Sequence, residues 1–300
     1  MTSTPSAACT VPTRVQPSGS FAADLHARIG ELVDQVDQLA PAYQNAEPFP
    51  HIAIDDFLPA HLVDALQDAF PGPGSDVWTK LPTEDQKGKY AAQDEGRFPE
   101  LLRSLIHELN AGPFVAFLER LTGVEELIAD AKLSGGGLHR TESGGKLSVH
   151  VDFSHHPANG LNRRLNLLLY LTPEWQDDYG GHLELWSWGD DKRPEAKILP
   201  KFNRCAIFST SPWSYHGQPE PLTCPPELAR QSVALYYFSN GRPDHEAMEH
   251  NTSFHSRPDE EAPLGTRLVR AASSGLVRDL LPPVVYRGLR RAWNRRTEST

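Results

Sequence analysis

The apolar positions in the first third of the chain follow helical spacing. Between residues 21 and 39 they fall three or four apart, which predicts an amphipathic helix that packs on a core. Residues 51–59 predict a strand that leads into a turn, and residues 60–70 predict the helix after it. One or two more helices are predicted over residues 98–121, with a break at the Gly-Pro pair inside that range.

From about Ala131 the pattern changes to short apolar runs separated by Gly, Pro and Asn. Several short strands at this spacing predict a sandwich or a barrel. The 26 prolines and 22 glycines also favour turns and short strands over a helical bundle. We therefore expect a mainly β fold of the α+β type. The predicted strands span residues 146–153, 164–171, 182–188, 204–209 and 230–239.

The composition changes again toward both ends, which sets the expected domain organisation. Residues 1–20 are rich in Ser, Thr and Pro and predict a disordered tail. Residues 21–245 predict a single domain with its β core at about 131–240, and residues 246–300 predict a C-terminal extension with a basic helix. Residues 266–300 contain eight arginines and two acidic residues, which gives this segment a net charge of +6. This tail is either a solvated helix or a contact for acidic membranes or an acidic partner.

Composition narrows the class of protein. The net charge of -10 argues against general nucleic-acid binding, because phosphate contacts need a dense basic face. The 3 cysteines are too few and too scattered for a disulfide framework, which fits a reducing cytoplasm. We find neither a secretory leader pattern nor an apolar run of transmembrane length, so we expect a cytoplasmic protein without a transmembrane segment. No pattern predicts an oligomeric state.

One predicted strand carries half of a metal site. His150 and Asp152 are two residues apart, so on a strand both side chains leave the same face. One imidazole and one carboxylate on one face form part of a facial triad, which leaves open positions on an octahedral metal. His216, at the end of a short predicted strand, is the candidate for the third ligand. A His-x-Asp pair alone is weak evidence in a chain with 13 histidines.

Other polar residues near this pattern have more ordinary explanations. His182 and Glu184 also share a strand face, but no third ligand is suggested for them, so we interpret them as polar residues of the barrel wall. His155 and His156 follow the motif in a loop and are predicted to face substrate or solvent. Arg163 and Arg164 are predicted to be charged residues of the surface, and binding of a substrate carboxylate is the alternative.

A second polar pattern opens the last predicted strand. Arg230 begins a strongly β-prone run, and Ser232 lies one step further along the same face. A guanidinium at the rim of an otherwise apolar barrel can hold a carboxylate through two parallel hydrogen bonds. Such an arginine would anchor a co-substrate with two carboxylates.

Taken together, His150-x-Asp152, then His216, then Arg230-x-Ser232 resembles the Fe(II)/2-oxoglutarate-dependent oxygenases, in particular the prolyl-4-hydroxylase-like branch. The likeness covers residues 133–240 and a segment at 48–58, about half the chain. It implies a double-stranded β-helix, a jelly-roll of cupin-like form, with N-terminal helices packed outside and a C-terminal helical tail. It also implies Fe(II), 2-oxoglutarate as co-substrate, and dioxygen.

The resemblance assigns further roles. Tyr170 stands where related hydroxylases place a tyrosine that donates a hydrogen bond to the carboxylate held by Arg230. His139 and Arg140 lie where relatives place a polar side chain near the 1-carboxylate of 2-oxoglutarate, although an exposed loop position explains them equally well. The implied activity is hydroxylation of an unactivated C–H bond, with succinate and carbon dioxide as co-products. Halogenation is disfavoured, because halogenating relatives lack the carboxylate that Asp152 provides here.

The nature of the substrate is the least determined point. We expect a small molecule, an amino acid or a specialised metabolite, because no segment resembles a peptide-recognition module. Two alternatives stay open. One is a prolyl hydroxylase that acts on a protein or peptide, and the other is a cupin-like barrel that binds a metal or ligand without redox chemistry. Arg230 argues against the latter, since a binding barrel has no need for a carboxylate anchor.

Overall fold

The computed structural model describes residues 21–188, 192–244 and 249–257. The chain divides into two compact units, Met1–Phe254 and His255–Thr300. The predicted disordered tail at 1–20 and the predicted basic helix near the C-terminus lie outside the described residues. Everything below concerns the first unit.

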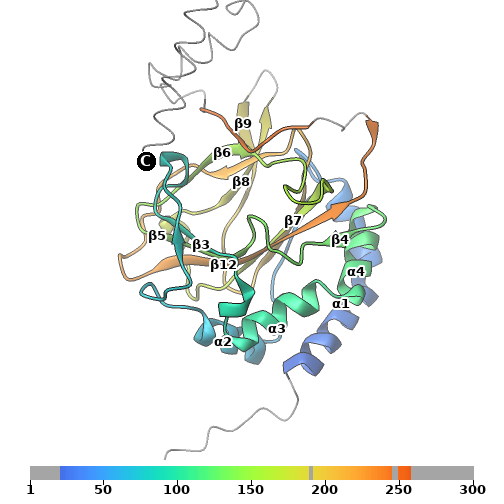
Figure 1. The fold of residues 1–300 in the computed structure, drawn as a ribbon, viewed down its shortest axis with the longest axis horizontal. Coiled ribbons are helices and arrows are strands. Elements are labelled where there is room, and N and C mark those ends of the chain that lie inside the picture. Colours follow the sequence, from blue (N-terminus) through green and yellow to red (C-terminus); the bar gives the residue numbers. More distant parts are fainter. Residues whose placement is uncertain (1–20, 189–191, 245–248, 258–300) are drawn as a thin grey trace, which may run out of the picture. The chain divides into compact units, whose positions relative to one another are not determined.

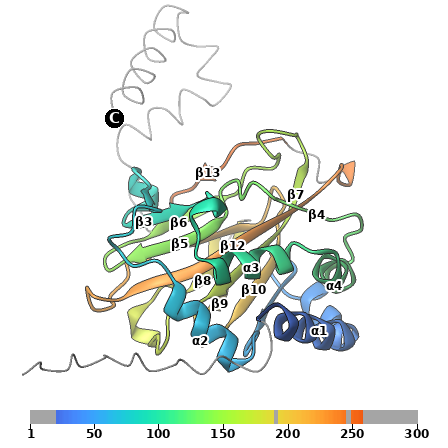
Figure 2. The same cartoon turned by 60° about the horizontal axis from the view of Figure 1, so that its bottom comes forward.

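Four α-helices cover one side of this unit (Figure 2). The first keeps the helical spacing of the sequence and buries one face, including Leu25, Ile29 and Leu32, but it continues five residues beyond the predicted end. None of the helices in the described residues has both the length and the apolar character of a membrane span. The helices are α1 (Phe21–Gln44), α2 (Ala60–Ala69), α3 (Glu100–Leu109) and α4 (Gly112–Thr122), with short 3-10 turns at Glu84–Gln86, Glu95–Arg97 and Asp177–Tyr179.

The larger of two β-sheets lies against these helices (Figure 1). Its strands follow the order β1-β10-β7-β12-β5-β3-β2, β4 also pairs with β12, and every pairing is antiparallel. The strands are β1 (His51–Ile54), β2 (Thr79–Lys80), β3 (Lys89–Ala92), β4 (Ile128–Ala129), β5 (Gly137–Glu142), β7 (Asn162–Tyr170), β10 (Cys205–Ser209) and β12 (Ala229–Ser239).

The smaller sheet has the order β13-β6-β11-β8-β9 and is also antiparallel throughout. From β5 to β12 the chain passes repeatedly from one sheet to the other, which is the connectivity of a jelly roll. The predicted mainly β, jelly-roll fold with helices packed outside is thus confirmed. The strands are β6 (Leu147–Val151), β8 (Leu183–Trp188), β9 (Lys192–Ile198), β11 (Tyr215–Gln218) and β13 (Ser253–Phe254).

Successive side chains of β7 point alternately into the core next to the helices and into the space between the sheets. Leu165, Leu167 and Leu169 are fully buried in the cluster that contains the helices. Their neighbours Asn166 and Leu168 point the other way, because successive side chains of a strand leave opposite faces. This second face lines a cavity between the two sheets, and the candidate site lies there.

Candidate metal centre and co-substrate cavity

Three predicted ligands meet on the inner face of the smaller sheet. His150 near the end of β6 is paired directly with His216 on the antiparallel neighbour β11, and the two ring centroids are 4.3 Å apart. Asp152 follows β6 and completes the group. Its Oδ1 lies 3.5 Å from Nε2 of His150, and its Oδ2 lies 3.4 Å from Nε2 of His216. Within the described residues, no other group of His, Cys, Asp and Glu side chains brings its ligand atoms together in this way.

The backbone sets the orientation of both imidazole rings. Nδ1 of His150 lies 2.9 Å from the carbonyl oxygen of Ser148, and Nδ1 of His216 lies 2.9 Å from that of Ser214. A carbonyl oxygen only accepts, so in each neutral ring Nδ1–H donates and Nε2 keeps a free lone pair. Both lone pairs therefore belong to the nitrogens next to Asp152, and such backbone bonds are typical of metal-ligating histidines.

The charges in this group suit a divalent cation. Burial lowers the pKa of His216 to about 4, and the neighbouring His150 adds to this effect. Burial raises the pKa of Asp152, but the Arg163 guanidinium and the two imidazoles outweigh it and hold that pKa well below its usual range. Two imidazoles and one carboxylate are the donor set of the facial triad that binds iron(II).

Asp152 is held by two buried partners that the sequence did not reveal. Asn166 donates from Nδ2 to Oδ2 of Asp152 at 2.7 Å, and Arg163 approaches the same oxygen at 3.1 Å. Arg163 also donates to Oδ1 of Asn166, and its guanidinium lies 3.5 Å from the ring centroid of Tyr236. The prediction that Arg163 is a surface charge is wrong, because this side chain is 1% exposed and neutralises a buried carboxylate.

The triad opens onto a cavity of about 140 Å³ between the sheets. Both sheets contribute side chains, and the polar side chains outside the triad lie mainly on β3, β5, β7 and β12. The apolar wall of the cavity is formed by Leu168, Leu183 and Phe208. The lining residues outside the triad that matter for the chemistry are Lys89, His139, Thr141, Arg163, Asn166, Arg230 and Ser232.

Arg230 reaches this cavity with an unused hydrogen-bond donor. Its NH2 group donates to the hydroxyl of Tyr170 at 3.1 Å, whereas its Nε is buried and has no partner among the described residues. A buried guanidinium N–H without a partner is costly, so an acceptor such as a carboxylate fits there. Tyr170 is fully buried and meets the site through Arg230 rather than lining the cavity itself. Ser232 lines the cavity on the same strand.

A glycine makes room for this arginine. Gly181 adopts a φ of +77°, and a Cβ at this position would lie 3.2 Å from Cδ of Arg230 and 2.7 Å from the side chain of Leu222. The second glycine of the Gly180-Gly181 pair therefore permits the close approach of the Arg230 stem.

Lys89 is a further cation in the cavity, and sequence reasoning missed it. It lies on β3 opposite Thr141 of β5, and both side chains line the cavity. Burial lowers the pKa of Lys89 to about 8, with the charge of Arg230 adding to this effect. Within the described part of the chain its amine has no hydrogen bond or ion pair. No local pattern marks Lys89, since β3 is short and lies in a polar segment.

Of the two polar residues predicted near the 1-carboxylate, only His139 faces the cavity. Its Nε2 donates to the carbonyl of Gly135 at 3.1 Å, and burial, together with Lys89, lowers its pKa well below the usual range. Arg140 is the next residue on β5 and points to the opposite face, with its Nε 3.8 Å from Oε1 of Glu142. The structure does not bring Arg140 into the site.

The remaining histidines have other partners. His182 contacts Asp177 at 3.1 Å, and Glu184 pairs with Lys197 at 2.7 Å, so this second pair does not form a ligand set. His156 is buried against Asp130 at 3.3 Å. The prediction that His156 faces substrate or solvent is therefore wrong.

Comparison with known proteins gives a family match over the residues of this site. Residues 136–238 match the model of the 2OG-Fe(II) oxygenase superfamily, and this range contains the triad, Tyr170 and Arg230. Prolyl 3-hydroxylase OGFOD1 of Xenopus laevis is 27% identical over 202 residues, covering 63% of this chain and 35% of that protein. The Mus musculus protein of the same name is 26% identical over 213 residues, with 67% and 37% covered. A Pseudomonas putida prolyl-4-hydroxylase structure aligns with a TM-score of 0.48 at 17% identity, covering 69% of this chain and 98% of that one.

These relatives correct one expectation. The preference for a small-molecule substrate is wrong, because both curated relatives are prolyl hydroxylases, and a prolyl residue is part of a polypeptide. The chain spans about a third of the length of these relatives. The expected resemblance to the Fe(II)/2-oxoglutarate-dependent oxygenases is confirmed over the jelly-roll core, where residues 136–238 match the model of the 2OG-Fe(II) oxygenase superfamily.

Proposed function

We propose that this chain is an Fe(II)- and 2-oxoglutarate-dependent dioxygenase that hydroxylates a prolyl residue of a protein or peptide. One observation carries the proposal: the His150–Asp152–His216 group and the Arg230 guanidinium, with its unpaired Nε, face the same cavity. The choice of a prolyl residue comes from the curated relatives. Retention of Asp152 favours hydroxylation over halogenation.

The metal would be held by Nε2 of His150, Nε2 of His216 and a carboxylate oxygen of Asp152. Bound there, iron supplies the activation of dioxygen that is coupled to conversion of 2-oxoglutarate to succinate and carbon dioxide. The protein's part is positional. The carbonyls of Ser148 and Ser214 keep the two rings aimed at one point, and Asn166 with Arg163 keeps Asp152 ionised and oriented.

The co-substrate would be anchored by charge at the far side of the cavity. Arg163 is compensated by Asp152, so Lys89 and Arg230 are the cations left to face a dianion such as 2-oxoglutarate. Arg230 offers its free Nε–H to the distal carboxylate, with Tyr170 holding the guanidinium in place. Lys89 adds a second positive charge from β3, and Ser232 and His139 offer polar atoms nearby.

The apolar wall completes the site. Leu168, Leu183 and Phe208 line the cavity beside the triad, and such side chains exclude water from the reacting groups. Holding the co-substrate and the target C–H bond in one fixed geometry is the main contribution that a protein makes to this chemistry.

The test is turnover of the full chain with Fe(II), 2-oxoglutarate and a library of proline-containing peptides. We expect succinate formation above the peptide-free level and a peptide mass gain of one oxygen atom. His150→Ala should abolish both signals, whereas His182→Ala, from the other His-x-acid pair, should keep them. Metal binding without succinate from any peptide would instead favour the cupin-like binding protein.

A further inference from the structure

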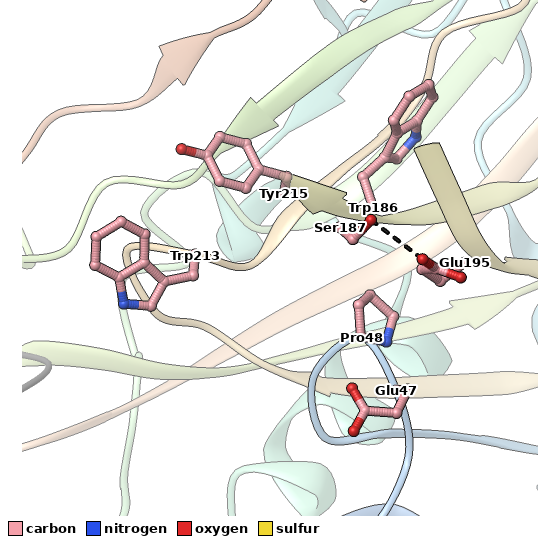
Figure 3. A pocket seen from close by; sticks show the side chains of 7 residues that line it. All are labelled: Glu47, Pro48, Trp186, Ser187, Glu195, Trp213 and Tyr215. Carbon is pink, nitrogen blue, oxygen red and sulfur yellow. Dashed lines mark hydrogen bonds between the residues drawn. The ribbon is translucent and has the colours of Figure 1, made fainter. Parts of the chain in front are cut away.

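A second, larger cleft lies on the other face of β11. Its volume is about 540 Å³, and Figure 3 shows its side chains arranged around an open centre. Because His216 points into the cavity between the sheets, its neighbour Tyr215 points to the opposite face, where it is paired with Trp186 of β8. We call this the aromatic cleft, and its lining residues are Glu47, Pro48, Trp186, Ser187, Glu195, Trp213 and Tyr215.

The aromatic cleft combines one exposed ring, that of Trp213, with negative charge. Trp213 is 59% exposed, although an indole of this size is usually buried or placed at an interface. Glu195 is engaged by Arg193 at 3.0 Å and by the hydroxyl of Ser187 at 3.2 Å. Glu47, in contrast, has an exposed carboxylate with no hydrogen bond or ion pair to the described residues. Ring faces and a free carboxylate together favour a cation, and they disfavour an anionic ligand.

The position of the aromatic cleft relates it to the proposed reaction. Tyr215 and His216 are consecutive residues, so one strand carries a wall of the cleft on one face and a metal ligand on the other. Tyr215 is the first residue of β11, so a polypeptide that presents one residue to the triad can reach the aromatic cleft only by passing around the start of this strand. At about 3.4 Å per extended residue, such a path takes several residues.

We propose that the aromatic cleft binds a lysine or arginine side chain of the polypeptide substrate, a few residues from the prolyl residue that is hydroxylated. This inference rests on the proposed function for its link to substrate. The binding itself depends only on the cleft: Trp213 and Tyr215 supply ring faces, and Glu47 supplies the countercharge. A proline or another apolar side chain would make no use of Glu47.

Binding can be measured apart from catalysis. The probe is a fluorescein-labelled glycine-serine peptide with one proline and flanking arginines, and its partner has citrulline in place of each arginine. Fluorescence polarisation is recorded with the full chain, free of iron. We expect the arginine peptide to bind more tightly than the citrulline peptide. Trp213→Ala and Glu47→Gln should each lower the affinity for the arginine peptide by about fivefold. Trp213→Phe should retain part of the affinity that Trp213→Ala loses.

The control variant is Glu125→Gln, which removes an exposed carboxylate outside the aromatic cleft and should leave binding unchanged. Equal binding of the two peptides, no binding up to millimolar concentrations, or unchanged binding in Glu47→Gln would each overturn the proposal. Succinate formation by the unaltered chain is assayed separately. Cation-selective binding without succinate formation would support the proposed role of the aromatic cleft and refute the proposed hydroxylase activity. Succinate formation without cation-selective binding would support the activity and refute the role of the cleft.

Discussion

Asn166 donates a hydrogen bond of 2.7 Å to Oδ2 of Asp152, the carboxylate oxygen that also faces His216. The same amide accepts two hydrogen bonds from Arg163 through its Oδ1, so its orientation is determined from both ends. Asn166 thus links a buried cation to the carboxylate of the triad. A group of this kind tunes metal affinity without touching the metal.

Replacement of Asn166 should therefore weaken metal binding. In Asn166→Leu the volume is kept, but Asp152 and Arg163 each lose a partner, and we expect metal affinity to fall by about 10- to 100-fold. The measurement is competition with a chelator of known affinity. Asn159→Ala, in an exposed loop, is the control and should bind as the unaltered chain does. Equal affinity in both variants would show that Asn166 does not position Asp152.

Removal of the second cation should weaken co-substrate binding. Lys89→Met keeps the length of the side chain but deletes the charge, and we expect the affinity for 2-oxoglutarate to fall by about tenfold. Calorimetric titration of the manganese-loaded protein without oxygen measures this directly. Lys87→Met, an exposed residue two positions earlier, should have no effect. If both variants bind 2-oxoglutarate equally well, Lys89 faces another part of the cavity.

The two glycines before β8 should respond differently to substitution. Both have positive φ angles, so Gly180→Ala and Gly181→Ala should each lower the free energy of unfolding by about 1–3 kcal/mol. Only the Cβ at 181 would meet Arg230, whereas a Cβ at 180 would meet nothing within 4 Å. We therefore expect Gly181→Ala alone to weaken 2-oxoglutarate binding as well, by about tenfold. A loss of the same size in both variants would contradict the role given to Gly181.

The link between β1 and β10 should make stability depend on pH. A hydrogen bond from Arg204 is the main cause that lowers the pKa of Asp55 from 3.8 to about 2, with Lys201 contributing. A depressed carboxyl pKa stabilises the fold above the unfolded-state value and loses that effect as pH falls toward the folded-state value. Asp55→Asn should thus lower the urea midpoint at pH 7, and the difference from the unaltered chain should shrink between about pH 4 and pH 2.

The control for this prediction is Asp64→Asn, which removes an exposed carboxylate on α2. It should leave the urea midpoint unchanged at each pH. A constant deficit of Asp55→Asn across the whole pH range would mean that the contact acts through packing rather than charge.

Local patterns in the sequence predict most of the fold but only part of the site. The helix over residues 21–39 and the strand that carries His150, with Asp152 directly after it, were predicted from the spacing of residues within one segment. β9 was missed because it is a mostly polar strand at the edge of its sheet, where no buried face imposes alternation. β3 was missed because it has only four residues.

Contacts between side chains from separate strands cannot be predicted from spacing within one segment. Arg163 meets Asp152 across the space between two sheets, so its burial follows from topology and not from its neighbours in sequence. The resemblance to known oxygenases predicted the closed barrel and the roles of Tyr170 and Arg230 in holding the distal carboxylate of 2-oxoglutarate. It did not supply the substrate.

The two imidazoles and one carboxylate of this site have a consequence for the supply of metal. Sites of nitrogen and oxygen donors bind divalent ions in the order iron, cobalt, nickel, copper, with zinc below copper, so a cluster of this composition does not by itself prefer iron. Which ion occupies it is decided by the metal ions available while the protein folds. Protein recovered from a nickel column or a zinc-rich medium is therefore expected to carry the wrong ion until it is stripped and reloaded without oxygen.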